Sequence, residues 1–261
     1  MRCTLLTISV ILFSSTLFAQ SPEVLDAFEQ RQFRTAEGDS LLYRWLSPEK
    51  VEEGKTYPLI LFLHGAGERG NDNTAQLTHV LPRFVEPQRR SRYPAFIFAP
   101  QCPSDDYWTH GDFTDNREGF ILNDTMGKAL SLTVEALALM VNRYPIDPDR
   151  VYIVGLSMGG GGTWELIMRF PDFFAAAVPI CGFSDPRYAG GLAGLPIWAF
   201  HGLEDNVVPP ALSQQMVNAV NEAGGHALLT EFPGVGHGSW EPAFPEEPFI
   251  YDWLFGQRRS N

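Results

Sequence analysis

The clearest hydrophobic pattern lies in the middle of the chain, where residues 151–154 are apolar at every position. Such a run predicts a strand covered on both faces, because a strand with one face in water alternates apolar and polar residues. The motif Gly155-Leu156-Ser157-Met158-Gly159 follows, and further glycines are expected to turn the chain into a helix over residues 163–168. A strand that turns through Gly-X-Ser-X-Gly into a helix exposes its serine hydroxyl. The pattern predicts a nucleophilic Ser157, with a plain glycine-rich turn as the alternative.

Apolar runs and helical spacing alternate along the rest of the chain. Two alternating segments, 32–35 and 41–46, flank a Gly/Asp turn and predict an antiparallel hairpin at a sheet edge. Further strands are predicted at residues 57–63, 96–100, 175–180, 196–200 and 227–232. Helices are predicted at residues 74–84, 125–144, 210–222 and 247–255, and loops at 87–94, 101–123 and 182–195. This order predicts an α/β fold with a central, mostly parallel sheet, an antiparallel N-terminal hairpin, and helices on both faces.

A serine hydroxyl becomes a good nucleophile only when a base takes its proton, so Ser157 needs a histidine. In folds with this turn the acid and then the histidine follow the serine along the chain, which leaves His201, His226 and His237. His201 comes at the end of a predicted strand, where a structural histidine bonded to the backbone is expected. His226 is expected to be solvated. His237 lies in a glycine-flanked loop after the last predicted strand and is the predicted base.

The acid and the oxyanion donors are predicted from their positions after predicted strands and beside the nucleophile. Glu204 and Asp205 both come after the predicted strand at 196–200, and an apolar segment that would fix the loop follows Asp205. We therefore predict Asp205 as the acid and Glu204 as a solvated neighbour. The N–H groups of Met158, next to the nucleophile, and of Ala66, in a glycine-rich loop after an earlier strand, are the predicted oxyanion donors.

Several motifs, taken together and in this order, resemble those of the α/β-hydrolase superfamily. They are Phe62-Leu63-His64-Gly65-Ala66-Gly67-Glu68-Arg69-Gly70, Ala99-Pro100-Gln101-Cys102-Pro103, Gly155-Leu156-Ser157-Met158-Gly159-Gly160, Val178-Pro179-Ile180-Cys181-Gly182, Trp198-Ala199-Phe200-His201-Gly202 and Gly234-Val235-Gly236-His237. Within the superfamily the chain is similar to exported bacterial phospholipase/carboxylesterase and feruloyl-esterase-like serine esterases, which are often labelled predicted peptidases.

The resemblance implies an α/β-hydrolase fold and no cofactor. It also implies roles for individual residues. The implied triad is Ser157, Asp205 and His237, and the implied backbone donors are those of Ala66 and Met158. Residues that the resemblance implies along the substrate cleft are Gln101, Trp108 and Trp240. For the two tryptophans, packing beneath a lid is the alternative.

The N-terminus and the charge bear on location and partners. One arginine, a short apolar core and a polar stretch predict a signal peptide at 1–19, with a membrane anchor as the alternative, followed by a single catalytic domain at 20–261. We therefore expect a secreted or periplasmic protein without stable membrane insertion. A formal net charge of −12 disfavours a nucleic-acid partner. Cys102 and Cys181 lack metal-ligand spacing, so we expect no metal and two unpaired buried thiols, although a disulfide between them stays open.

The leading functional hypothesis is a secreted serine carboxylesterase that forms an acyl-enzyme. Its expected substrates are small or carbohydrate-linked esters, including feruloyl or acetyl esters of carbohydrates. A serine peptidase of the prolyl-oligopeptidase type is the second hypothesis, although such enzymes usually carry a large N-terminal propeller where this chain has a short hairpin. A catalytically inactive hydrolase fold used for binding is the third. The sequence leaves the oligomeric state open.

Overall fold

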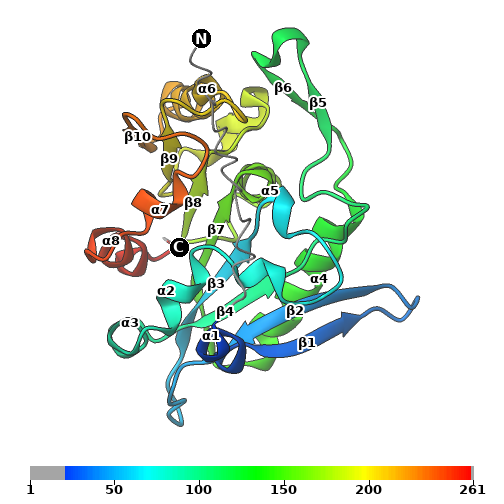
Figure 1. Ribbon diagram of the computed structural model, residues 1–261, viewed down its shortest axis with the longest axis vertical. Coiled ribbons are helices and arrows are strands. Elements are labelled where there is room, and N and C mark those ends of the chain that lie inside the picture. The colour runs from blue at the N-terminus through cyan, green and yellow to red at the C-terminus, as the bar shows by residue number, and fades with distance from the viewer. Residues whose placement is uncertain (1–20, 260–261) are drawn as a thin grey trace, which may run out of the picture.

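An eight-stranded sheet forms the centre of the molecule in the computed structural model, which describes residues 21–259 (Figure 1). Its strands run in the order β1-β2-β4-β3-β7-β8-β9-β10. The first pairs, β1 with β2 and β2 with β4, are antiparallel, and every later pair is parallel. The strands are β1 (Glu29–Arg34), β2 (Ser40–Leu46), β3 (Tyr57–Leu63), β4 (Phe96–Pro100), β7 (Ile146–Leu156), β8 (Ala176–Ile180), β9 (Trp198–Gly202) and β10 (Leu228–Phe232). The predicted mostly parallel sheet with an antiparallel N-terminal hairpin is therefore confirmed.

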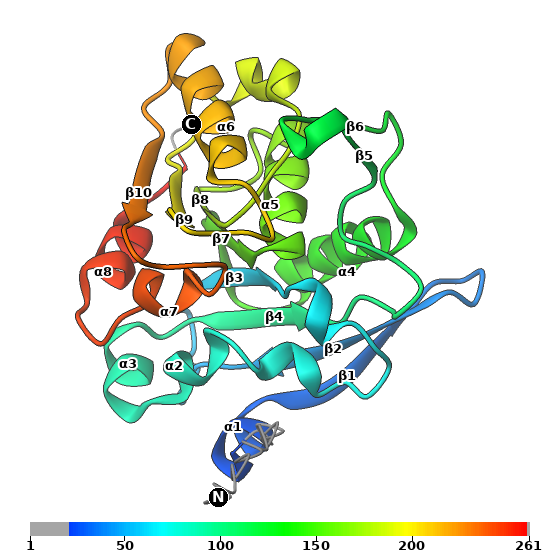
Figure 2. The same cartoon turned by 45° about the horizontal axis from the view of Figure 1, so that its top comes forward.

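Helices cover both faces of this sheet, as the hydrophobic pattern predicts (Figure 2). One face packs against α4 (Lys128–Arg143), α5 (Met158–Arg169) and α6 (Pro210–Glu222). The other packs against α1 (Pro22–Ala27), α2 (Leu81–Val85), α7 (Trp240–Ala243) and α8 (Phe249–Gly256), and α3 (Pro87–Arg92) lies against α2. Along β3, Leu59 and Leu61 belong to the first core, while Ile60 and Phe62 belong to the second. Because successive side chains point to opposite faces, a strand between two helical layers is apolar at every position.

Two helical segments differ from the prediction. The helix expected over 74–84 is broken into a 3-10 turn at Ala75–Leu77 and the short helix α2, because Val80 between them has a φ of 61°, outside the helical region. The loop expected at 87–94 is mostly the helix α3. Its proline stands at the first helical position, where the missing N–H removes no helical hydrogen bond. The sequence did not predict this helix, because the segment is polar throughout and has no hydrophobic period.

The nucleophile helix also begins earlier than predicted. It starts at Met158, directly after Ser157, so Gly159 and the three glycines after it lie inside α5 rather than in a turn before it. Glycine is a poor helix former, so the sequence signal favoured a turn. Packing explains the glycines: a Cβ on Gly159 would lie 1.9 Å from the carbonyl oxygen of Leu63 in β3.

The region predicted as a loop at 101–123 contains a second, two-stranded sheet. Strands β5 (Gly111–Phe113) and β6 (Phe120–Leu122) pair in antiparallel fashion and stand at one side of the molecule, away from the main sheet (Figure 1). We call residues 111–122 the β5–β6 hairpin. Strands of three residues are too short to leave an alternating pattern, so the sequence did not predict them. Two further 3-10 helices lie in predicted loops, at Asp115–Arg117 and Pro186–Leu192.

The N-terminal leader and the two cysteines were also predicted from the sequence. The expected signal peptide at residues 1–19 lies outside the described residues. From residue 21 to residue 259, no helix is both long and apolar enough to cross a bilayer. Cys102 and Cys181 are both buried and unpaired, as predicted.

The close approach of α5 to β3 gives a prediction for stability. Replacing Gly159 with alanine puts a methyl group against the backbone of β3, which cannot move without shifting the central strand. We expect Gly159→Ala to lower the free energy of unfolding by about 1–3 kcal/mol or more, measured by urea denaturation. Gly190→Ala is the matched control, because no atom beyond the adjacent backbone lies within 4 Å of its added Cβ, and should stay within about 0.5 kcal/mol. Equal midpoints for both variants would contradict the packing argument.

Candidate active site

Ser157 stands at the junction of β7 and α5, at the carboxyl edge of the sheet. Its backbone has φ 54° and ψ −117°, a region that non-glycine residues rarely occupy. The Ser157 N–H donates to the carbonyl of Ile180 in β8 at 2.9 Å, which helps to hold this conformation. A Cβ on Gly155 would lie 2.2 Å from the carbonyl oxygen of Gly159, so the turn closes only around glycine. The predicted strand, sharp turn and helix are therefore present, and the serine side chain projects from the turn.

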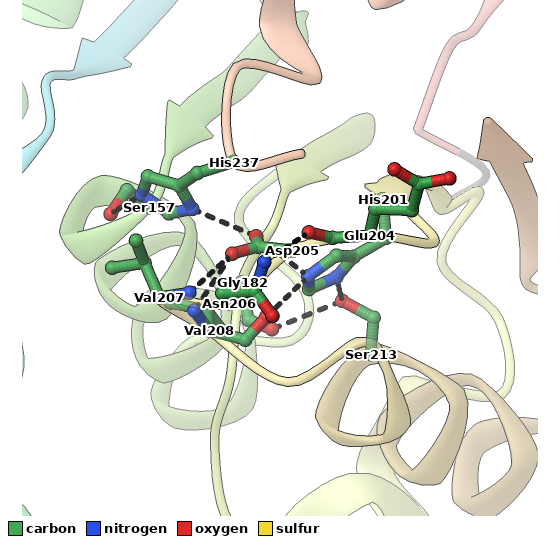
Figure 3. Close-up of polar contacts among 10 residues, drawn as sticks. All are labelled: Ser157, Gly182, His201, Glu204, Asp205, Asn206, Val207, Val208, Ser213 and His237. Carbon is green, nitrogen blue, oxygen red and sulfur yellow. Dashed lines mark hydrogen bonds and ion pairs between the residues drawn. The ribbon is translucent and has the colours of Figure 1, made fainter. Parts of the chain in front are cut away.

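The structure brings Ser157, at the start of α5, together with Asp205 and His237, from the loops after β9 and β10 (Figure 3). His237 Nε2 lies 2.9 Å from Ser157 Oγ, and His237 Nδ1 lies 2.8 Å from Asp205 Oδ2. The carboxylate can only accept, so Nδ1 carries the proton of the neutral ring and Nε2 is left to accept from the serine hydroxyl. This is the tautomer that a histidine needs to act as a general base toward serine.

The Asp205 carboxylate is fully buried, yet it is the most heavily hydrogen-bonded group of the site. Its Oδ1 accepts the backbone N–H groups of Val207 at 2.8 Å and Val208 at 2.9 Å (Figure 3). Burial alone would raise the pKa of Asp205, but the hydrogen bonds from His237 and from these two N–H groups outweigh it and lower the pKa below its usual value. The carboxylate therefore stays ionised beside His237. Glu204 is exposed, as expected of a solvated neighbour.

His201 is a partner of Asp205 that the sequence did not predict. The expected backbone bond is present, because His201 Nε2 lies 3.0 Å from the carbonyl oxygen of Val208. The same nitrogen lies 3.2 Å from Asp205 Oδ2, and His201 Nδ1 lies 2.7 Å from Ser213 Oγ (Figure 3). Both groups near Nε2 are acceptors, so Nε2 carries the proton, and burial lowers the pKa of His201 and keeps the ring neutral. The position of this histidine four residues before the acid was the available signal.

The two predicted oxyanion donors lie at the starts of two helical turns beside Ser157. Met158 is the first residue of α5, and Ala66 is the first residue of a 3-10 turn at Ala66–Glu68. The first N–H groups of a helical turn have no partner within that turn. Both residues line the same cavity as Ser157. A Cβ on Gly65 would come within 2.9 Å of Leu156 Cδ1, so the loop packs closely against the residue before the serine.

The His64 side chain holds the loop that carries Ala66 in place through two hydrogen bonds. The His64 Nδ1–H donates to the carbonyl of Gly65 at 2.7 Å, and Nε2 accepts the N–H of Cys102 at 2.9 Å. The bond from the Cys102 N–H requires the neutral ring, because a proton on Nε2 would face that N–H. Burial lowers the pKa of His64 to about 4, in agreement with this arrangement.

Two residues predicted along the cleft lie elsewhere. Gln101 is buried and accepts the N–H of Asn73 at 2.7 Å while donating to the carbonyl of Glu68 at 3.1 Å. Trp108 is fully buried and donates its Nε1–H to the carbonyl of His64 at 3.0 Å. Both side chains support the loop that carries Ala66 instead of lining the cavity, so the cleft prediction is corrected for these residues.

Trp240 contacts the predicted base, and a set of aromatic residues to which the sequence assigned no role shares a cavity with Ser157. The Trp240 ring meets the His237 ring edge to face, with centroids 5.5 Å apart, so its place at the cleft stays a prediction. A cavity of about 450 Å³ opens beside the serine. Its aromatic wall comes from the segment predicted as loops, where no periodic pattern pointed to it, and consists of Tyr107, His110, Phe113, Phe120 and Phe183.

Among residues 21–259, one group of potential metal ligands gathers, and it coincides with the site. Donor atoms of Cys181, Asp205 and His237 lie within 4.8 Å of one another. Burial raises the pKa of the Cys181 thiol to about 12, so in the absence of a metal this sulfur is protonated near neutral pH. The other two side chains already bond to each other. The arrangement favours proton transfer over metal binding.

Comparison with known proteins places the chain among hydrolases. A model of the dienelactone hydrolase family matches residues 98–247. A solved thermostable esterase is 36% identical, with a TM-score of 0.81 over 90% of this chain and 64% of its own. A probable carboxylesterase of Oryza sativa subsp. japonica is 25% identical over 80% of this chain and 82% of its own length. An uncharacterized secreted protein of Arthroderma benhamiae is 26% identical over 75% of this chain but only 23% of its own length.

The neutral state of His64 gives a pH prediction. The unfolded chain takes up a proton at His64 below about pH 6.5, whereas the folded chain does so only near pH 4. The free energy of unfolding should therefore fall as the pH drops from about 6.5 to about 4, with His64 contributing about 1–2 kcal/mol between pH 7 and pH 5. We expect urea denaturation of His64→Gln to show a smaller loss over this range than the wild type.

The control is His226→Gln, which changes an exposed histidine and should leave the pH dependence unchanged. A wild-type slope in His64→Gln would show that other groups cause the acid sensitivity.

Proposed function

Because the chain belongs to the dienelactone hydrolase family, within the α/β-hydrolase superfamily, we propose that it is a serine hydrolase of carboxylic esters. The observation that carries the proposal is the chain of two hydrogen bonds that joins Ser157 through His237 to the buried carboxylate of Asp205. The likeness to a thermostable esterase at 36% identity supports ester bonds as the target.

The proposed reaction uses groups of the chain alone, without a cofactor or metal. Ser157 Oγ attacks the ester carbonyl while His237 Nε2 takes its proton, and ionised Asp205 stabilises the imidazolium that forms. The N–H groups of Ala66 and Met158 stabilise the oxyanion. His237 then gives its proton to the departing alcohol. Water attacks the acyl-enzyme with His237 again as the base, which releases the acid and restores Ser157.

We further propose that the enzyme is exported and acts on small or carbohydrate-linked esters, feruloyl and acetyl esters of carbohydrates included. The predicted leader at residues 1–19 supports export, and the Arthroderma benhamiae relative, which is named a secreted protein, agrees with it. The net charge of −12 favours neutral substrates over anionic ones and argues against a nucleic-acid partner.

Covalent labelling tests the nucleophile. A fluorophosphonate probe should label the wild type at Ser157 and leave Ser157→Ala unlabelled, because the probe reacts only with an activated serine. The same two proteins should be assayed on p-nitrophenyl acyl esters, methyl ferulate, acetylated xylan and a prolyl peptide. We expect ester turnover in the wild type alone.

The matched control is Ser104→Ala, which removes an exposed hydroxyl and should label and turn over like the wild type. An unlabelled wild type would refute the serine mechanism, and turnover of the peptide without any ester would make the protein a peptidase.

The acid is tested by removing its charge at constant size. In Asp205→Asn the amide can donate to His237 Nδ1, which favours the wrong tautomer, so kcat should fall by roughly 10³–10⁴-fold. Glu204→Gln, a change at the exposed neighbour, should retain wild-type kcat. A large loss in Glu204→Gln together with an active Asp205→Asn would reverse the assignment of the acid.

A further inference from the structure

Three phenylalanines form a contiguous wall in the cavity beside Ser157. Phe113 and Phe120 come from the β5–β6 hairpin, and Phe183 comes from the segment after β8. The three ring centroids lie 4.8–5.1 Å apart in pairs, at tilted or edge-to-face angles. Aromatic rings attract one another in these geometries beyond what their buried area contributes. A further flat ring would therefore find favourable partners here.

The β5–β6 hairpin is held in place by polar contacts with the body of the protein. Arg169 of α5 donates to the carbonyls of Asn123 at 2.7 Å and Asp124 at 2.8 Å, just after β6. The Leu122 N–H donates to Asp185 at 3.2 Å, and Gln215 of α6 donates to the carbonyl of Glu118 at 2.8 Å. A wall fixed in this way is formed before a ligand arrives, which reduces the entropy lost on binding.

The position of the wall relative to the triad decides which part of an ester it would meet. The cavity lining includes Ser157 and both proposed oxyanion donors, Ala66 and Met158. His237, as the structure describes it, is not among the lining residues. The departing alcohol must receive its proton from His237, whereas the acyl group stays on Ser157. A lining that holds the serine and both proposed oxyanion donors, without His237, favours the acyl group over the alcohol as the part of the ester that enters this cavity.

We propose that this cavity is an acyl-side subsite for an aromatic ring. The inference rests on the proposed function and narrows its substrates to esters of arylalkanoic and arylalkenoic acids over acetyl esters. Its volume of about 450 Å³ falls within the range of roughly 300–1,000 Å³ that small-molecule sites occupy. Arg117 also lines the cavity, with its guanidinium carbon 4.8 Å from the centroid of Phe113, and adds a cation beside the aromatic wall.

A pair of matched esters tests the ring preference. Methyl 3-phenylpropanoate and methyl 3-cyclohexylpropanoate share a chain length and a leaving group and differ in the aromaticity of the ring. We expect wild-type kcat/KM to favour the phenyl ester by about two- to tenfold, the size of one aromatic pair. In Phe113→Leu and Phe183→Leu this ratio should fall toward one, because each change replaces one ring of the wall with an aliphatic side chain. A wild-type ratio in both variants would overturn the assignment of the wall.

Ile121→Thr is the matched control for disturbance of the hairpin. Ile121 lies in β6 between Phe120 and Leu122, which are both buried, but its own side chain is exposed. It should keep the wild-type ratio. A reciprocal pair, 2-phenylethyl and 2-cyclohexylethyl propanoate, carries the ring on the alcohol and should show a ratio near one. A preference confined to this second pair would overturn the acyl-side assignment.

Two further measurements separate this inference from the proposed function. If p-nitrophenyl acetate is hydrolysed by the wild type but the phenyl and cyclohexyl esters react equally, the ring subsite is refuted and the esterase stands. Binding of 3-phenylpropanamide and 3-cyclohexylpropanamide to Ser157→Ala, measured by calorimetry, does not depend on turnover. Tighter binding of the phenyl amide supports the subsite. If no ester is hydrolysed at all, the esterase and the acyl-side assignment both fail.

Discussion

The contact between α5 and the ends of β3 and β7 is the constraint on which the rest of the site depends. Gly159 lets the helix lie against the backbone of Leu63, and Gly155 lets the strand turn tightly into the helix. This approach places the start of α5 beside the loop that begins at His64, so that Met158 and Ala66 line one cavity. The unusual backbone of Ser157 is a consequence of the same close packing. Four consecutive glycines weaken the helix locally, and the surrounding sheet holds it in place.

The second feature that shapes the site is a buried charge surrounded by donors. Asp205 accepts hydrogen bonds from two backbone N–H groups and faces two histidine rings. An isolated carboxylate would lose much of its solvation energy in such a position, whereas donors on every side compensate for that loss. His201 is neutral and held by Ser213, so it supports the carboxylate without adding a charge. His237 remains the ring that joins the acid to the serine.

Most of the fold and the residues around Ser157 could be predicted from sequence, for physical reasons that also explain the failures. The strands at 57–63 and 96–100 are apolar throughout because helices cover both faces, and the structure has the same bounds. Ser157, Asp205 and His237 follow three of the strands, so parallel topology brings them to one edge. Gln101 and Trp108 lie in a region without a period, and side-chain direction there depends on long-range contacts. For the same reason Phe113, Phe120 and Phe183 were not predicted to share a cavity.

The β5–β6 hairpin has no ladder hydrogen bonds to the main sheet, within the described residues, and is attached mainly through side-chain contacts with α5, α6 and the loop after β8. Its sequence can therefore change length or composition without disturbing strand register or the triad. Catalysis and the selection of the substrate are therefore tasks of different elements in this chain, whereas many enzymes combine them in one element. Grafting a different hairpin between residues 110 and 123 becomes a practical route to new selectivity on an unchanged catalytic core.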